Sequence, residues 1–346
     1  MSAWSHYVAL GAWNVALLAR IRRGRELPSD RLLPSASGMP RPTLPRRLFL
    51  AFVAVAIASC SLVSFALAAA AKSPVADAAP APLRVMSFNI RNSRAQDGAN
   101  AWPKRTELLF ATIAQYGPDL IGFQEVLADQ YDALVACLPQ YGFSGVARDD
   151  GARQGEWSCV AYRKDRFTAV KSGDFWLSET PTVIGSKSWD AALTRLCSWV
   201  RLREIGTDRE YVFANTHFDH KGVIARQESS RVLSRELSEI ARGVPAILVG
   251  DFNITEDNPA YAVLVRPTTP GALPWIDAYR AVHPTRQPDE SSFHGFKGGS
   301  AGSRIDFIFH TRHFQAKGAA IDRTEQTGLW PSDHYAVTAE LKLDSR

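Results

Sequence analysis

The sequence predicts a layered α/β sandwich whose polar functional residues gather at the ends of buried strands. Two observations predict this fold class. Beyond residue 83, short apolar runs of strand length are interspersed with amphipathic runs of helical length, and several of the apolar runs end at a polar side chain. No internal repeat or long linker interrupts this region, so we expect one domain over residues 83–346. The 346-residue chain is 46% hydrophobic and 22% charged, which suits a substantial core.

The predicted elements follow from local composition. Runs rich in branched and aromatic residues, bounded by turn residues, predict the strands, and apolar residues at helical spacing predict the helices. The expected strands are residues 83–90, 119–124, 158–162, 195–202, 211–216, 246–249, 305–309 and 336–343, and the expected helices are residues 105–116, 129–138 and 225–241. Gly117-Pro118 ends the first helix, and residues 172–190 form a turn-rich connection.

The excess positive charge lies in the N-terminal region. The formal net charge is +5, but residues 1–72 contain nine Lys/Arg and two Asp/Glu, which leaves 31 basic and 33 acidic residues for the remainder. Any phosphate-binding surface of the domain is therefore local or assisted by a metal ion. The four cysteines form no CxxC pair, so we expect neither a thiolate metal site nor a disulfide framework.

The N-terminal 82 residues have the composition of an export signal or a membrane anchor. We divide them into a basic region (1–47), an uncharged apolar run (48–71) and a Pro/Ala-rich linker (72–82). The 24-residue apolar run is long enough to span a bilayer, and Arg46-Arg47 before it resembles a twin-arginine signal. A cleaved signal, lipidation at Cys60 and a retained anchor stay open. Each predicts an exported domain, either periplasmic, secreted or membrane-anchored. Met39 is a second candidate start, which would leave residues 1–38 untranslated.

Five strand ends present polar groups that can carry chemistry. These are Asn89, Glu125, His217, Asp251 with Asn253, and Asp333 with His334. A carboxylate and an amide side by side, as in the Val-Gly-Asp-Phe-Asn stretch 249–253, can orient an attacking water or bind a cation. A single such motif is more often an Asx turn than a catalytic site. Five of them, each beside a buried strand, predict one concave polar site.

Six ordered segments carry a family resemblance. They are SFNIR at 87–91, GFQE at 122–125, NTH at 215–217, GDFN at 250–253, RIDF at 304–307 and SDHY at 332–335. In this order they resemble the signature segments of the endonuclease/exonuclease/phosphatase family, which includes DNase I. The resemblance covers about residues 83–343. It implies a four-layer αββα sandwich (DNase I-like) and Mg²⁺-dependent cleavage of a phosphate ester.

The resemblance also implies a role for each polar residue. Three residues with oxygen donors would hold Mg²⁺, with Mn²⁺ as the alternative: Asn89, Glu125 and Asp333. Magnesium prefers such ligands and keeps several waters, so few side chains suffice. Asp251 and Asn253 would orient or activate the attacking water. His217 and His334 would donate to the phosphate oxygens or move protons near neutral pH.

A carboxylate partner is expected for each histidine. The family pattern implies Asp306 for His334, although Asp306 could instead pair with Arg304. Glu156 is the analogous candidate for His217, because in DNase I a glutamate stands seven positions before the arginine that ends a Tyr-Arg strand. The resemblance therefore implies two carboxylate–histidine pairs around one phosphate.

Two arginines are candidates for binding the substrate phosphate. Arg91 follows the first strand, and Arg195 offers bidentate donors if it faces the site. An outward, ion-paired Arg195 is an equally good interpretation. Four tryptophans in the middle of the chain favour core packing over stacking on a base or sugar: Trp157, Trp176, Trp189 and Trp199.

We therefore expect an exported Mg²⁺-dependent phosphoesterase that hydrolyses a phosphodiester or phosphomonoester by in-line attack of water. The SFNIR segment and the position of Glu156 favour nucleic acid, as for an extracellular or periplasmic DNase I-like nuclease. The near-neutral domain disfavours it, as does Gln154, which occupies the position of a sugar-stacking tyrosine in DNase I.

The middle segments resemble a bacterial subgroup of metal-dependent hydrolases, so small or lipid-linked phosphate esters rank level with nucleic acid. An inert surface binding module is the remaining alternative, although no matched residue is missing. The membrane is a partner only if the N-terminal segment is retained or lipidated, and no obligate protein partner is evident.

Overall fold

Two six-stranded sheets lie face to face at the centre of the fold, in the computed structural model that describes residues 82–344. The first sheet contains β1 (Leu83–Asn89), β2 (Leu120–Gln124), β3 (Tyr141–Ser144), β4 (Val160–Arg163), β11 (Phe314–Asp322) and β12 (Ala336–Leu343). The second contains β5 (Phe167–Trp176), β6 (Leu196–Glu204), β7 (Glu210–His217), β8 (Ala246–Asp251), β9 (Ile276–Asp277) and β10 (Asp306–His310). The helices are η1 (Gly98–Asn100), α3 (Trp102–Tyr116), α4 (Ala128–Cys137), α5 (Val223–Ile240), α6 (Pro259–Val265) and α7 (Ala278–Val282).

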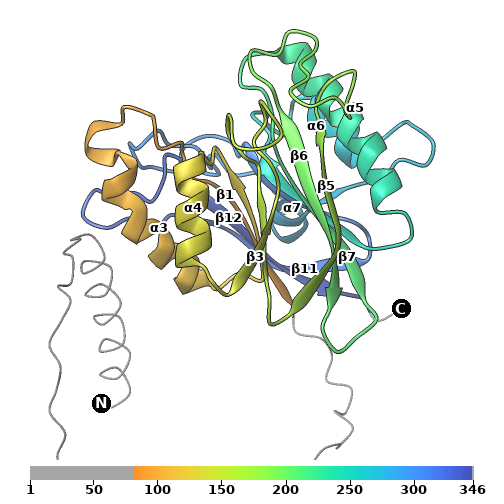
Figure 1. Cartoon of the computed structure of the whole chain (residues 1–346), viewed down its shortest axis with the longest axis horizontal. Helices are drawn as coiled ribbons and strands as arrows, with labels where there is room; N and C mark the ends of the chain where they lie inside the picture. Colours follow the sequence, from red (N-terminus) through yellow and green to blue (C-terminus); the bar gives the residue numbers. More distant parts are fainter. Residues whose placement is uncertain (1–81, 345–346) are drawn as a thin grey trace, which may run out of the picture. The chain divides into compact units, whose positions relative to one another are not determined.

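The helices cover the two outer faces of the paired sheets. Figure 1 shows α3 and α4 on one side and α5 and α6 on the other. Three hydrophobic clusters fill the spaces between these layers. Val85 and Val249 belong to the cluster between the sheets, Phe88 and Ile113 to the cluster beneath α3 and α4, and Leu248 to the cluster beneath α5 and α6. Three interfaces between four layers confirm the predicted sandwich.

A parallel strand pair lies at the centre of each sheet. The strand orders are β11-β12-β1-β2-β4-β3 and β5-β6-β7-β8-β10-β9. The parallel pairs are β1 with β2 and β7 with β8. Parallel strands are buried on both faces, which explains why their sequences are nearly continuous apolar runs and why their existence was predictable. The carboxyl ends of these four strands carry most of the predicted site residues.

Several elements were not predicted. They are η1, β3, β5, β9, β11, α6 and α7. The expectation of a turn-rich connection over residues 172–190 was wrong at its start, because β5 extends to Trp176. β5 is an edge strand, and its middle residues are exposed on both faces, so no hydrophobic alternation marks it.

The predictions for the leader lie outside the described residues. These are the basic region 1–47, the apolar run 48–71 and most of the linker 72–82. Among the helices of residues 82–344, none has the length and apolar character needed to cross a bilayer. Within the same range Cys137, Cys159 and Cys197 are free thiols.

A buried polar contact joins the two sheets below the site. Gln124 Nε2 donates to Asn215 Oδ1 (2.7 Å), and Asn215 Nδ2 donates to the backbone oxygens of Phe123 and Cys159 (both 2.8 Å). A Cβ atom at Gly122 would lie 2.3 Å from Val249 Cγ2 and 2.7 Å from Asn215 Cγ. The sheets can approach this closely only because residue 122 has no side chain.

We predict that Gly122→Ala lowers the free energy of unfolding by about 1–3 kcal/mol, because the added methyl group overpacks the interface between the sheets. Chemical denaturation measures the change. Gly318→Ala is the matched control, since a Cβ there would meet no atom closer than 3.8 Å. Equal stability of the two variants would show that the sheets can separate to admit a methyl group.

Candidate active site

A cavity of about 580 Å³ opens at the carboxyl ends of the central parallel strands. Among the predicted residues, it is lined by Arg91, Glu125, Glu156, Arg195, His217, Asp251, Asn253, Asp333 and His334. Asn89 and Asp306 lie buried in direct contact with this set. The structure therefore brings together all eleven residues that the sequence indicated, from both sheets and six connections.

Asn89 joins the two sheets within the site. Its Nδ2 donates to Glu125 Oε1 (3.1 Å) in its own sheet and to Asp251 Oδ2 (3.0 Å) in the other. The same nitrogen lies 3.4 Å from His334 Nε2. Ser332 Oγ donates to the Asn89 backbone oxygen (2.7 Å), which fixes the segment before β12 against β1. One amide thus sets the spacing between the carboxylates of Glu125 and Asp251.

Three site residues have a left-handed backbone although none is glycine. Arg91, Glu125 and Asn253 have φ angles of 54°, 61° and 50°. Each stands one or two residues beyond the end of β1, β2 or β8. This conformation costs conformational free energy in any residue that has a Cβ atom. At these three positions it turns each polar side chain back toward the cavity.

His334 forms the predicted pair with Asp306. Its Nδ1 lies 2.9 Å from Asp306 Oδ2, and both side chains are buried. Burial alone lowers the pKa of His334, but Asp306 and Asp251 outweigh it and raise that pKa well above its usual value. His334 is therefore a cation at neutral pH. The alternative pairing of Asp306 with Arg304 is excluded, because Arg304 pairs with Asp277 and Glu256.

His217 has the opposite character. Burial, and then the positive charge of Arg195, lower the pKa of His217 well below its usual value, so the ring is neutral. Its Nε2 lies 3.1 Å from Asn253 Nδ2 and 3.4 Å from Asp251 Oδ2. Burial and repulsion from Asp306 raise the pKa of Asp251 to about 7, so this carboxyl can exchange a proton near neutral pH.

The expected pairing of Glu156 with His217 was wrong. Glu156 Oε2 lies 2.6 Å from Arg148 Nη1, and His217 Nδ1 is buried without a hydrogen-bond partner. The physical reason is charge, because a permanently charged guanidinium such as that of Arg148 stabilises a buried carboxylate more than a neutral imidazole does. Glu156 still lines the cavity, and burial raises its pKa despite Arg148.

Both candidate arginines face the site. Arg195 lines the cavity while nearly completely buried, and its Nε and Nη1 have no hydrogen-bond partner. Burial lowers its pKa to about 10, so it keeps its charge at neutral pH. The Arg91 guanidinium lies between two carboxylates, 4.0 Å from Glu125 and 3.7 Å from Asp333. Arg195 is therefore not the outward residue of the alternative interpretation, although its Nε lies 3.9 Å from Asp219 Oδ2.

The expected ligands fit a divalent cation. Burial, and then repulsion from Glu125, raise the pKa of Asp333. A bound cation would therefore stabilise the two carboxylates, Glu125 and Asp333. The amide oxygen of Asn89 accepts from the Arg91 backbone N–H (3.0 Å) and its nitrogen faces Glu125, so Asn89 would join this donor set with its amide turned over. Oxygen donors suit Mg²⁺. Asp251, Asp306 and His334 also bring ligand atoms within 4.8 Å of one another. The hydrogen bond to Asp306 and the raised pKa of His334 make that second cluster the poorer metal site.

Other cavity residues were not predicted from the sequence. They are Asn92, Asp97, Leu193, His220, Phe293, Gly295, Phe296 and Ile305. Asn92 donates twice to Glu125 Oε2, and Asp97 pairs with Arg91. Ile305 belongs to the RIDF segment and to the expected strand 305–309, one residue before β10 begins. The other seven lie on connections without hydrophobic periodicity, so nothing in the local pattern separated them from ordinary loop residues.

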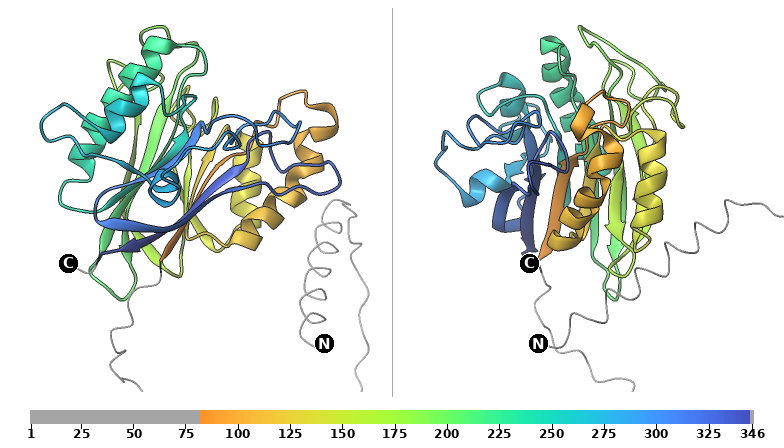
Figure 2. Two further views of the ribbon diagram at one scale, coloured as in Figure 1. Left: turned by 180° about the vertical axis from the view of Figure 1, so that it is seen from behind. Right: turned by 90° about the vertical axis from the view of Figure 1, so that its left-hand side faces the viewer.

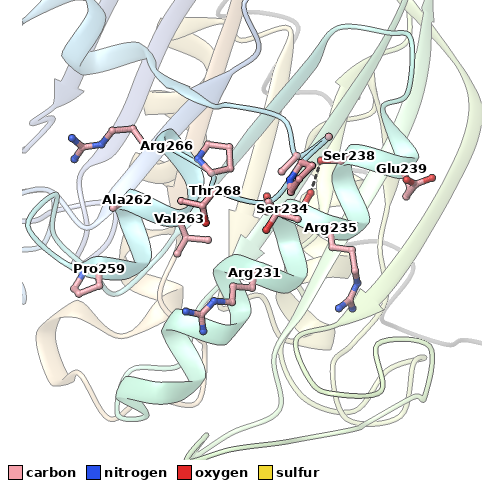
Figure 3. A pocket seen from close by; sticks show the side chains of 15 residues that line it. Arg231, Ser234, Arg235, Ser238, Glu239, Pro259, Ala262, Val263, Arg266 and Thr268 are labelled. Atoms are coloured by element: carbon pink, nitrogen blue, oxygen red, sulfur yellow. Dashed lines mark hydrogen bonds between the residues drawn. The ribbon is translucent and has the colours of Figure 1, made fainter.

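A second cavity, of about 320 Å³, lies between α5 and α6 and shares no residue with the first. Figure 3 shows its three arginines, Arg231, Arg235 and Arg266, pointing in different directions. Two of them pair with neighbouring acids, Arg231 with Glu228 and Arg235 with Glu236. The chemistry of the molecule is therefore concentrated in the first cavity.

The sequence model of the Endonuclease/Exonuclease/phosphatase family matches residues 86–334. The chain belongs to this family. A family member of known structure from Bacteroides vulgatus is 34% identical, with a TM-score of 0.70, over 77% of this chain and 100% of that one. The mannosyl-6-phosphatase of Bacteroides thetaiotaomicron is also 34% identical, with a TM-score of 0.66, over 75% and 99%.

Curated relatives are more distant. Nocturnin of Drosophila melanogaster is 24% identical over 309 residues, which cover 75% of this chain and 47% of that protein. The chain spans about half or less of the length of the curated relatives it matches. Members of the family are phosphoesterases and nucleases and are generally metal-dependent, so the chain belongs to a family of hydrolases.

The residues of the site can divide the hydrolysis of a phosphate ester among them. Asp251 and Asn253 can hold a water and accept its proton, because the pKa of Asp251 lies near neutrality. The His334 imidazolium and the Arg195 guanidinium can donate to phosphate oxygens as negative charge grows. A cation held by Asn89, Glu125 and Asp333 would neutralise phosphate charge and stabilise the leaving oxygen.

We predict that His217→Ala and His334→Ala each lower turnover by at least about a hundredfold, because each removes an imidazole from the cavity that would bind the phosphate. His283→Ala is the matched control, since this exposed histidine lies outside the cavity. Turnover is measured with circular dichroism spectra as a check of folding. A folded variant with a near-normal rate would remove that histidine from the mechanism.

Proposed function

We propose that this protein is an exported, Mg²⁺-dependent phosphoesterase whose substrate presents a compact phosphorylated head group, such as a sugar phosphate. The carrying observation is the convergence, in one cavity, of a near-neutral carboxyl at Asp251, an imidazolium at His334 and the buried guanidinium of Arg195. A group that accepts a proton and two that stabilise negative charge meet there.

Three observations support a compact head group. The similarity to a mannosyl-6-phosphatase extends over 99% of that chain at 34% identity. The cavity volume of about 580 Å³ lies in the range of small-molecule sites. Residues 73–346 contain 31 basic and 33 acidic residues, so the domain lacks the excess positive charge typical of a nucleic-acid surface.

A nuclease is the second candidate. Phe293 and Phe296 line the cavity, and Phe293 is 47% exposed, so a base or sugar could stack there. A panel of substrates distinguishes the candidates. The purified full chain is assayed with Mg²⁺ against sugar phosphates, phospholipids, RNA and plasmid DNA. We expect hydrolysis of a phosphorylated sugar or lipid head group. Cleavage of nucleic acid alone would support the nuclease, and no hydrolysis at all would support an inert binding module.

We predict that a chelator abolishes hydrolysis and that added Mg²⁺ restores it, with Mn²⁺ as the competing ion. Glu125→Gln is expected to raise the Mg²⁺ concentration for half-maximal rate by about 10–100-fold, because it removes one charged ligand. Glu179→Gln, which alters an exposed carboxylate outside the cavity, is the control. Full activity in the chelator would contradict the metal-dependent mechanism.

Export is proposed from the Arg46-Arg47 pair and the apolar run 48–71. We expect the protein recovered from cells to lie outside the cytoplasm, and its mass identifies the processing. Cleavage near Ala70, a lipid on Cys60 and an intact segment each give a different mass. Recovery of the unprocessed chain from the soluble cytoplasm would contradict export.

A further inference from the structure

The guanidinium of Arg91 lies beside two of the expected metal ligands. Its Nη1 is 4.0 Å from Glu125 Oε2, and its Nε is 3.7 Å from Asp333 Oδ2. The two carboxylates are largely buried, with 13% and 8% of their side chains exposed. Buried carboxylates that share one place repel each other unless a cation lies close by. Arg91 supplies such a cation from the protein itself.

Asp97 holds this guanidinium in place. Arg91 Nε and Nη2 donate to the two carboxylate oxygens of Asp97, both over 3.1 Å. These hydrogen bonds raise the pKa of Arg91 despite its burial, and the charges of Asp333 and Glu125 raise that pKa further. The pair of Arg91 and Asp97 therefore keeps a positive charge beside the two carboxylates at neutral pH.

The side chain of Arg91 has freedom that its backbone lacks. The Arg91 backbone oxygen accepts hydrogen bonds from Arg105 Nη2 (2.7 Å) and Gln130 Nε2 (2.9 Å), which fix the chain at this point. The side chain is 32% exposed, and its Nη1 donates to no protein atom within residues 82–344. A substitution here therefore changes the charge beside the carboxylates without changing the path of the chain.

The other cations that act on these carboxylates are held elsewhere. Arg105 is fully buried and donates to the backbone oxygens at the ends of its neighbouring connections. His334 is buried as well, and its Nδ1 lies 2.9 Å from Asp306 Oδ2. Arg91 is thus the cation of this group whose side chain is both partly exposed and able to turn.

A positive charge at this position opposes the binding of a divalent cation. A carboxylate that already faces a guanidinium gains less from Mg²⁺, and the guanidinium also repels the ion directly. The charge that stabilises Glu125 and Asp333 beside each other therefore lowers their affinity for Mg²⁺.

We propose that Arg91 is an internal competitor of the divalent cation at Glu125 and Asp333, and that Asp97 is a positioning residue that limits this competition by holding the guanidinium. This inference rests on the proposed metal-dependent function, which supplies the cation. Occupancy of the metal site is then set in part by two side chains that are not themselves ligands.

Titration calorimetry of the full chain in detergent with MgCl₂, without substrate, tests the inference. We expect Arg91→Met to bind Mg²⁺ at least about fivefold more tightly than the wild type, because a competing positive charge is removed. Asp97→Asn is expected to bind Mg²⁺ at least about threefold more weakly, because an anion is lost and the guanidinium is released toward the two carboxylates. Arg94→Met is the control and is expected to match the wild type, since this exposed arginine of the same connection lies outside the cavity.

The opposite signs of the two effects separate competition from a structural role. Both variants lose the ion pair between Arg91 and Asp97, so a role limited to holding the connection predicts a change in the same direction for both. Arg91→Lys keeps the charge and is expected to stay closer to the wild type than Arg91→Met. Circular dichroism spectra recorded in a chelator check folding. Changes in the same direction, or equal affinities in all variants, would overturn the inference.

The calorimetric result is independent of the substrate and so distinguishes this inference from the proposed function. The expected affinities without hydrolysis of any ester in the substrate panel would contradict the proposed phosphoesterase and leave the competition supported. Hydrolysis by the wild type, with both variants changed in the same direction, would contradict the competition alone. Absence of Mg²⁺ binding in every protein would contradict both.

Discussion

The site depends on the distance between the two sheets. Asn89 belongs to one sheet and Asp251 to the other, yet their side chains are joined by a 3.0 Å hydrogen bond. The buried contact between Gln124 and Asn215 and the missing side chain at Gly122 hold the sheets together directly below it. Because the two sides of the interface are packed β-layers, any change in their separation moves Asn89 and Glu125 relative to Asp251 and Asn253.

Hydrogen bonds to backbone oxygens also fix the connections that follow β1 and precede β12. Arg105 on α3 donates to the backbone oxygens of Ile90 (2.6 Å), Arg91 (2.7 Å) and Pro331 (2.8 Å). It therefore fixes the end of β1 and the segment before β12 at the same point. The left-handed residues beyond β1 and β2 are held in part by such contacts, which offset the cost of their conformation. Precision at this site thus depends on a buried arginine that does not line the cavity.

The sequence indicated the site because its residues follow buried strands. Glu125 and Asp251 stand at the ends of apolar runs, and parallel strands bring such ends to one edge of a sheet. The pairing of Asp306 with His334 was implied by the family pattern and is confirmed. What the sequence could not predict arises from contacts between distant connections. Arg148 takes Glu156 away from His217, and nothing in the local pattern around residue 148 marks it as a partner.

The edges of the sheets were unpredictable for a related reason. β5 satisfies its backbone by pairing with β6 alone, so its side chains need no apolar alternation. Likewise, Phe293 lies on a connection whose position is set by packing rather than by periodicity. Site residues at the ends of central strands can therefore be predicted from the sequence. The residues that shape the mouth of the cavity can be identified only from the three-dimensional structure.

The pairing of the first and last strands has a consequence for engineering. Leu83 is directly opposite Leu341 in the antiparallel β1–β12 ladder, at the end of β1 remote from the site. Figure 2 shows β1 and β12 running side by side through the middle of the fold. A short peptide could therefore join the two ends, and new termini could be opened elsewhere, for instance at the exposed turn between β6 and β7. The same arrangement of strands in space can thus be formed by a chain that begins at a different strand. The domain can also be inserted into or fused with other proteins without obstructing its cavity.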